Sequence, residues 1–185
     1  MALSRINSSM IGAGDVSNTE HAYLNSVSSN VQTQIDGAGV ADVKFQARNS
    51  STDSNVTGNT GTPTIDFDTE TFDTGSNFAS DTFTAPSTGQ YLLITCVTVS
   101  GITSAGTFGR LNIITSNRTY SADYDPQNTA SVSGRGGFHL SVIADMDASD
   151  TATVRFESQN ESSDVHDIHG EATNSPTYFC GALLA

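Results

Sequence analysis

The sequence has no tryptophan, one lysine, two cysteines and no long run of apolar residues. A membrane-spanning helix needs about 20 apolar residues, and a signal peptide needs a shorter continuous apolar segment. We therefore expect no membrane insertion and no export by the general secretory route. Cys96 and Cys180 lie far apart and lack the spacing of a zinc site or a disulfide framework. We expect two buried free thiols and no cofactor.

Positive charge is also scarce, because seven Lys and Arg residues face twenty Asp and Glu residues, for a net charge of −13. Such a surface repels the phosphates of nucleic acid. The only lysine, Lys44, offers no polybasic patch for an anionic membrane. We expect neither partner, and we ascribe the acidity to solubility and resistance to aggregation.

Thr, Ser, Val, Asn and Gly are abundant, and from Val43 onward apolar and polar residues alternate in short segments. Clusters of Gly, Asn, Asp, Ser and Pro separate these segments, as turns require. Short strands at this spacing predict one all-β sandwich or barrel. The strand candidates are residues 43–47, 65–67, 83, 91–99, 108–115, 138–144, 151–156 and 178–184.

The N-terminal residues follow a different pattern, and we place a boundary between residues 1–39 and a head of residues 40–185. The first fifteen residues are small and polar apart from a few isolated apolar positions. This composition is typical of an extended arm that orders against a partner. The apolar positions, which we expect to anchor the arm, are Leu3, Ile6, Met10 and Ile11.

A short stem helix is predicted after the arm. Ser17 and Glu20 have the spacing of a capping box, and the apolar residues Leu24, Val27 and Val31 then recur at spacings of three and four. A helix of about 18 residues with one narrow apolar stripe is marginal in water unless that stripe is buried. Copies of the same helix are the obvious partner, and the Leu and Val positions favour three or more of them. The alternative is a helix that packs back on the sandwich.

Several of these segments match a known pattern. Phe83 is followed by a proline turn and by Gly89 and Tyr91, which lead into the central strand. Residues 43–47, 146–154 and 179–183 carry an opening strand, a turn before the last strands and a closing strand. Together they resemble the globular head of complement's first component, which shares the trimeric jelly roll of tumour necrosis factor. Leu93 replaces a usual aromatic residue and Ser149 a usual glycine, so the resemblance concerns the fold and no particular ligand site.

The resemblance implies a homotrimer. Tyr91, Leu93 and Phe179 share the parity expected of core residues, yet apolar residues also occupy the opposite parity of the same strands. In the family that second surface is the trimer interface, and Cys96 and Cys180 would lie on neighbouring strands. With the stem stripe, the interface would comprise Leu24, Val27, Val31, Leu92, Ile94, Cys96, Cys180, Ala182 and Leu184.

Residues 16–36 carry a second resemblance. An N-T-E start, a Y-L pair and a closing Q-T-Q-I-D resemble a segment common in tail-fibre and related appendage proteins of phages. This resemblance implies a structural protein of the virion surface that is assembled in the host cytoplasm. We expect a trimeric capsid decoration protein or short head fibre, anchored to capsid or tail proteins by its N-terminal arm. The alternative is a tail-fibre-type receptor-binding tip for a host ligand, although the lack of tryptophan weakens a glycan version.

Motifs for catalysis are not found, because the chain has no Gly-x-Ser-x-Gly sequence and its Gly-rich stretch lacks the lysine of a phosphate loop. We expect no enzymatic activity. One cluster could bind a metal or a receptor, or it could be a solvated loop: Asp164, His166, Asp167 and His169. A second group rich in oxygen ligands lacks the spacing of an EF-hand calcium site: Asp66, Asp68, Glu70 and Asp73.

Overall fold

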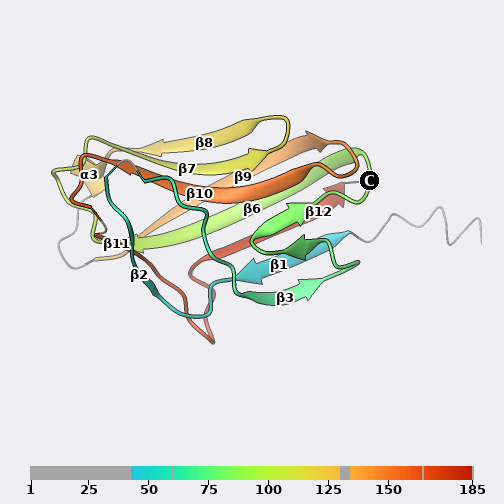
Figure 1. Ribbon diagram of the computed structural model, residues 1–185, viewed down its shortest axis with the longest axis horizontal. Helices are drawn as coiled ribbons and strands as arrows, with labels where there is room; N and C mark the ends of the chain where they lie inside the picture. Colours follow the sequence, from blue (N-terminus) through green and yellow to red (C-terminus); the bar gives the residue numbers. More distant parts are fainter. Residues whose placement is uncertain (1–42, 60, 130–133, 164, 185) are drawn as a thin grey trace, which may run out of the picture. The chain divides into compact units, whose positions relative to one another are not determined.

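The structure of the chain, a computed structural model, describes residues 43–59, 61–129, 134–163 and 165–184. These residues form two antiparallel β-sheets that pack face to face around an apolar core (Figure 1). The seven-stranded sheet contains β1 (Lys44–Arg48), β2 (Asp53–Thr57), β3 (Thr69–Asp73), β6 (Gly89–Ser100), β9 (Gly136–Met146), β11 (His166–Ile168) and β12 (Tyr178–Leu184). The five-stranded sheet contains β4 (Phe78–Ala79), β5 (Thr82–Thr84), β7 (Phe108–Thr115), β8 (Thr119–Tyr124) and β10 (Thr151–Gln159). One turn of helix, α3 (Pro126–Thr129), follows β8.

The long strand β6 organises the seven-stranded sheet. Its residues 89–99 pair with β9 on one edge. On the other edge, residues 90–96 pair with β12, and Val99 and Ser100 pair with β11. Because these two partners occupy successive parts of β6, β11 lies at one end of the sandwich and the last residues of β12 lie at the other (Figure 1). Strands β1 and β3 continue the sheet beyond β12, and β2 continues it beyond β11.

The alternation of residues along the strands creates the core. In β6 the side chains of Tyr91, Leu93, Val97 and Val99 are fully buried, whereas their neighbours along the strand are not. This is the core face predicted from the sequence. At one end of the core Phe45 stacks on Phe83 with 4.5 Å between ring centroids, and other aromatic rings surround this pair. Aromatic pairs of this kind contribute about 0.5–1.5 kcal/mol each beyond the area that they bury.

The turn segments hold their strands by hydrogen bonds. The hydroxyl of Tyr91 donates to the backbone carbonyl of Ser87 at 2.7 Å, which fixes the proline turn before β6. In the turn between β9 and β10, the carboxylate of Asp150 accepts from the amide of Asp147 at 2.8 Å. Ser149 adopts a φ of 76° in this turn. A left-handed conformation explains why the resembling family usually has glycine at this position.

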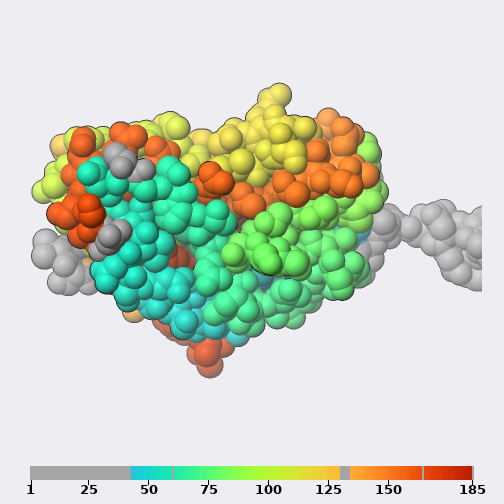
Figure 2. Space-filling model, in the orientation of Figure 1, coloured from blue at the N-terminus to red at the C-terminus, as the bar shows by residue number. Residues whose placement is uncertain are grey.

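The predicted strands at residues 43–47, 91–99, 108–115, 138–144, 151–156 and 178–184 are confirmed with small shifts in their ends. The predicted strand at residues 65–67 is wrong, because this segment makes only an isolated bridge from Thr64 to Arg155. The bridge brings residues near 65 alongside β10, and the two segments adjoin on the face seen in Figure 2. Strands β2, β3, β8 and β11 are polar and were not predicted.

The predictions for the N-terminal region lie outside the described residues. These are the arm with Leu3, Ile6, Met10 and Ile11 and the stem helix with its stripe, Leu24, Val27 and Val31. They stay predictions. In the part of the chain that the structure describes, no helix is long and apolar enough to cross a membrane.

Candidate oligomerisation surface

The seven-stranded sheet has a second apolar surface on the side that faces away from the core, which we call the outer face. It is formed by the alternate side chains of β1, β3, β6, β9 and β12 that the core does not use. All the predicted interface residues of the head lie on it and are partly or well exposed: Leu92, Ile94, Cys96, Cys180, Ala182 and Leu184. The sequence therefore predicted correctly which of these side chains point outward.

The strand register arranges these side chains in rows across the sheet. Leu92 lies opposite Ile143 of β9 and opposite Ala182 of β12. In the next row, Ile94 lies between Ser141 and Cys180. Side chains directly opposite each other on antiparallel strands have Cβ atoms about 5 Å apart, so each row makes a continuous contact across the strands.

The three most exposed large apolar side chains among the described residues all lie on this face. Phe72 is 44% exposed, Ile143 is 57% exposed and Leu184 is 37% exposed. Phe72 of β3 lies on the outer face because it is opposite Gln46 of β1, and Gln46 is in turn opposite Cys180 of β12. Scattered single apolar residues are ordinary on protein surfaces, but a contiguous group indicates an interaction site.

A shallow groove of about 260 Å³ runs across one part of the outer face. Its walls are formed almost entirely by apolar groups from β1, β3, β6 and β12, and Lys44 is the only charged residue that lines it. The lining residues include Phe72, Leu92, Ile94, Cys180 and Ala182. A groove of this composition fits an apolar side chain much better than a charged ligand.

Polar side chains flank Cys96 on the outer face. Cys96 has His139 opposite it on one side and Tyr178 on the other. The hydroxyl of Tyr178 lies 3.5 Å from Nε2 of His139. Cys180 is on the neighbouring strand, as the family resemblance implied, but it is opposite Ile94 and not opposite Cys96. Burial raises the pKa of both thiols and of the Tyr178 hydroxyl.

A second hollow of about 380 Å³ lies where β8 and β9 approach each other at the margin of the two sheets. It is lined by Asn117, Arg118, Tyr120, Ile143 and Asp145. Ile143 thus contributes both to the outer face and to this hollow. Among the described strands β9 is hydrogen-bonded to β6 alone, so within the described head the edge that it presents here carries backbone groups without a strand partner.

The predicted metal or receptor loop is not a solvated loop. Residues 166–168 form β11, His166 is fully buried, and His169 is 8% exposed. The remaining member of the group, Asp164, lies outside the described residues. The prediction failed because Ser, Asn and Gly residues surround this strand and hide its single apolar position, Ile168. Strand β11 lies at the end of the sandwich remote from the start of β1 (Figure 1).

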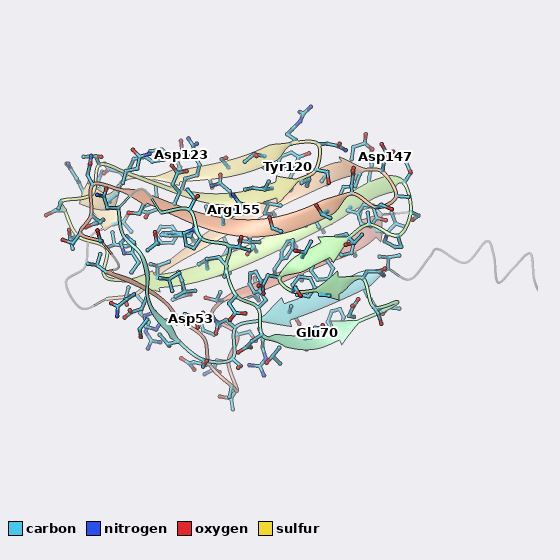
Figure 3. The ribbon with its side chains drawn as sticks, in the orientation of Figure 1. Asp53, Glu70, Tyr120, Asp123, Asp147 and Arg155 are labelled. Atoms are coloured by element: carbon cyan, nitrogen blue, oxygen red, sulfur yellow. The ribbon has the colours of Figure 1, made fainter. Side chains whose placement is uncertain are left out.

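Acidic side chains are distributed over the described head and form no set of three or more His, Cys, Asp and Glu residues arranged to bind a metal. Asp53, Glu70, Asp123 and Asp147 project from separate regions of the head in Figure 3. In the second acidic group of the sequence, which lacks calcium-site spacing, Asp68 accepts hydrogen bonds from the backbone amide and hydroxyl of Ser50.

Two surface carboxylates interact with charged neighbours: Asp66 lies near other carboxylates, and Asp123 lies beside an arginine. Burial, followed by the nearby charges of Asp81, Asp53 and Asp68, raises the pKa of Asp66. On the outer surface of the five-stranded sheet, Asp123 pairs with Arg110, which lowers the pKa of the Asp123 carboxyl. These interactions occur on the surface and neither creates a pocket.

Sequence reasoning missed two members of the outer face, Phe72 and Ile143. Ile143 has the outward parity of the predicted strand at residues 138–144, so the alternation alone could have identified it. Phe72 lies in the short polar strand β3, which offers no periodic signal. Only its pairing with Gln46 of β1 brings it to the groove.

Comparison with known proteins shows the fold of the head. No family model and no curated protein matches the sequence. Among solved structures, the globular domain of the zebrafish complement 1qA protein superposes with a TM-score of 0.53 at 14% identity, over 77% of this chain and 98% of that one. A crystal structure of murine APRIL superposes with a TM-score of 0.51 at 11% identity, over 77% of this chain and 99% of that one. The described head is therefore an all-β sandwich of the jelly-roll type seen in complement and TNF-like domains, as the sequence predicted.

Proposed function

We propose that this chain is a structural protein whose heads assemble as a homotrimer through the outer face of the seven-stranded sheet. The observation that carries the proposal is the gathering of Phe72, Ile143 and Leu184 on that one face beside the apolar groove. An exposed apolar surface of this extent costs free energy in water, at about 25 cal/mol for each Å² left uncovered. A second copy of the chain is the occupant that we favour.

The shape of the outer face supports a cyclic assembly. The groove lies over β1, β3, β6 and β12, whereas Ile143 marks the opposite margin of the sheet on β9. If the β9 margin of one copy packs into the groove of the next copy, the contact is head-to-tail. Repeated head-to-tail contacts form a closed ring when the rotation between successive copies adds up to a full turn. The jelly-roll likeness and the apolar stripe predicted for the stem helix both favour three copies.

A non-enzymatic role agrees with the chemistry of the described residues. Among the described residues, the one serine hydroxyl hydrogen-bonded to a histidine is that of Ser158, which contacts His166, and both side chains are fully buried. A nucleophile in that position cannot reach a substrate. The second hollow presents Arg118 and Asp145, but its lining holds no nucleophile beside a base.

The virion is the setting that we propose for this trimer. Support comes from the resemblance of residues 16–36 to appendage proteins of phages, which lies in the sequence and outside the described residues. The protein would be a capsid decoration protein or short head fibre whose N-terminal arm binds a capsid or tail protein while the head projects outward. A receptor-binding tip on a tail fibre is the alternative.

The trimer is tested by light scattering at micromolar concentration. We expect three chains per particle for the natural sequence and fewer for Ile94→Asp, because the new carboxylate would lie in the apolar contact. Thr153→Asp is the matched control, since Thr153 lies on β10 of the other sheet and is only partly buried. A monomeric mass for the natural sequence contradicts the assembly proposal.

The virion role is tested by deleting residues 1–15. The deleted protein should keep its trimer mass and thermal transition but should no longer associate with particles in immunogold labelling. Particles that still carry the deleted protein would place the anchor elsewhere. An absence of labelling with the intact protein would remove the virion role and leave the trimer untouched.

A further inference from the structure

The end of the sandwich formed by β2 and β11 is held by few apolar contacts. Strand β11 contributes one buried apolar side chain, Ile168, and β2 is largely exposed. The pairing of β11 with β2 is interrupted by a register shift between His166 and Ile168. Segments with little apolar burial open locally at a lower free energy than the rest of a domain.

The side chain of His166 connects this weak end to the other sheet. This side chain is fully buried, with 0% of its area accessible to solvent. Its Nδ1 lies 3.3 Å from the backbone carbonyl of Ser100 on β6, and its Nε2 lies 3.0 Å from the hydroxyl of Ser158 on β10. The imidazole therefore bridges from β11 in the seven-stranded sheet to β10 in the five-stranded sheet.

The acceptor at Ser100 determines which nitrogen carries the proton. A carbonyl oxygen can only accept, so Nδ1 donates its hydrogen to it. In the neutral ring Nε2 is then an acceptor, and the Ser158 hydroxyl donates to it. Protonation at Nε2 would turn this acceptor into a donor, reverse the Ser158 hydrogen bond and place a charge in the core.

The surroundings of the ring favour the neutral form. Phe156 contacts the ring edge-on with centroids 6.0 Å apart. The titratable groups that act on it are Asp167 on its own strand and Glu161 after β10, and Tyr124 on β8 lies near Ser158, the partner of the ring. Burial lowers the pKa of His166 and outweighs the attraction of the two carboxylates and the hydrogen bond to Ser100. The carboxylate of Glu161 is already bound by the amide and hydroxyl of Thr103.

We propose that His166 is an acid-sensitive link between the two sheets, whose protonation releases the β2 and β11 end of the head from the rest of the sandwich. The open state exposes the imidazole to water, where it binds a proton more readily than in the closed state. Because the closed form has the lower proton affinity, the link is intact above about pH 6.5 and weakens as the pH falls below that value. The inference does not depend on the proposed trimer.

Hydrogen exchange measures the opening directly. The amides of Val165 and His169 donate to the carbonyls of Thr57 and Thr98, so their protection reports the attachment of this end. Between about pH 7.5 and pH 5, their protection factors should fall by up to about 30-fold, the limit for one proton with an open-state pKa near 6.5. Amides of β7 and β10 in the sandwich centre should change much less.

Two glutamine variants separate this link from its neighbour. His166→Gln keeps a donor and an acceptor but does not titrate, so the acid-dependent loss of protection should disappear. His169→Gln removes the other histidine of this end and should leave most of the loss in place. An unchanged loss in His166→Gln, or a loss abolished only in His169→Gln, overturns the proposal.

A direct titration covers the case in which His166→Gln does not fold. The ring proton signals of the natural chain give the protonation midpoint of each histidine by nuclear magnetic resonance. The His166 midpoint should lie below about 6.5, the ordinary value for a histidine in water. A His166 midpoint at or above about 6.5 would mean that the folded head accepts the proton without cost and would overturn the link.

Discussion

Phe72 and Ile143 are on the same face of the seven-stranded sheet, but the strands β6, β12 and β1 separate them. At a strand spacing of about 4.8 Å the two side chains are roughly 19 Å apart, so one small contact cannot cover both. In a head-to-tail ring, Ile143 of one copy would meet the groove beside Phe72 of the next.

Mixing two variants tests this arrangement. Phe72→Asp and Ile143→Asp should each be monomeric by light scattering, because each places a carboxylate in the apolar contact. An equimolar mixture should form dimers, because one intact margin and one intact groove remain. If the face instead contacts itself across a twofold axis, mixing restores nothing, and Thr153→Asp serves again as the control with unchanged mass.

Ser149→Gly should stabilise the head. Ser149 has a φ of 76°, a conformation that costs an ordinary residue about 1–2 kcal/mol and glycine almost nothing. The backbone hydrogen bond from Ser149 to the carbonyl of Ala85 is retained in the variant. Greater freedom of glycine in the unfolded chain offsets part of the gain, so we expect about 0.5–1 kcal/mol from chemical denaturation. A decrease in stability would show that the serine side chain has a role of its own.

Gly109→Ala should destabilise the head strongly. A Cβ atom on Gly109 would lie 1.8 Å from Cζ of Tyr124, whose ring stacks on Phe156 with 5.5 Å between centroids. The ring also packs against Phe138 with 4.3 Å between centroids, so it cannot move aside without disturbing both aromatic contacts, and the expected loss is about 2–4 kcal/mol. Gly137→Ala is the matched control, because the nearest atom to its added Cβ is the Thr98 hydroxyl at 3.9 Å. Equal thermal transitions for the two variants would contradict the packing argument.

Cys96 and Cys180 should react slowly with an alkylating reagent in the folded protein and quickly after unfolding. Both are partly buried, and burial raises the pKa of each thiol, so the reactive thiolate is rarer than in a free cysteine near neutral pH. Mass spectrometry after unfolding should find two alkylated thiols per chain. A chain that resists alkylation until it is reduced would reveal a disulfide. If Ile94→Asp separates the trimer, the alkylation rate of the two thiols should rise in that variant, because both lie on the proposed interface.

Alternation allowed the sequence to predict the longest strands and their two faces. In β6, β9, β10 and β12 the inward-facing positions fall at every second residue and are mostly apolar, and this period is a property of an extended chain that no neighbour needs to impose. The segment from Phe83 to Tyr91 was also readable, since a proline turn and a tyrosine that binds the backbone of Ser87 are local features.

Short polar strands were not predictable in the same way. In β3 the order T-E-T-F-D shows no apolar period, and the strand exists because its backbone pairs with β1. The burial of the β11 histidine was not predictable for a related reason. Imidazole is polar in a sequence, yet hydrogen bonds to Ser100 and Ser158 satisfy both of its nitrogens inside the core.

The sequence by itself determined that the head is an all-β sandwich, which residues of its long strands point inward, and that apolar residues also point outward. Tertiary structure alone decided which outward residues gather into one surface. Phe72, Ala182, Leu92 and Ile143 come from four strands that are far apart along the chain, and the strand order and register place them in one plane. The period of a strand is local, whereas strand order depends on contacts between distant segments, which no local pattern encodes.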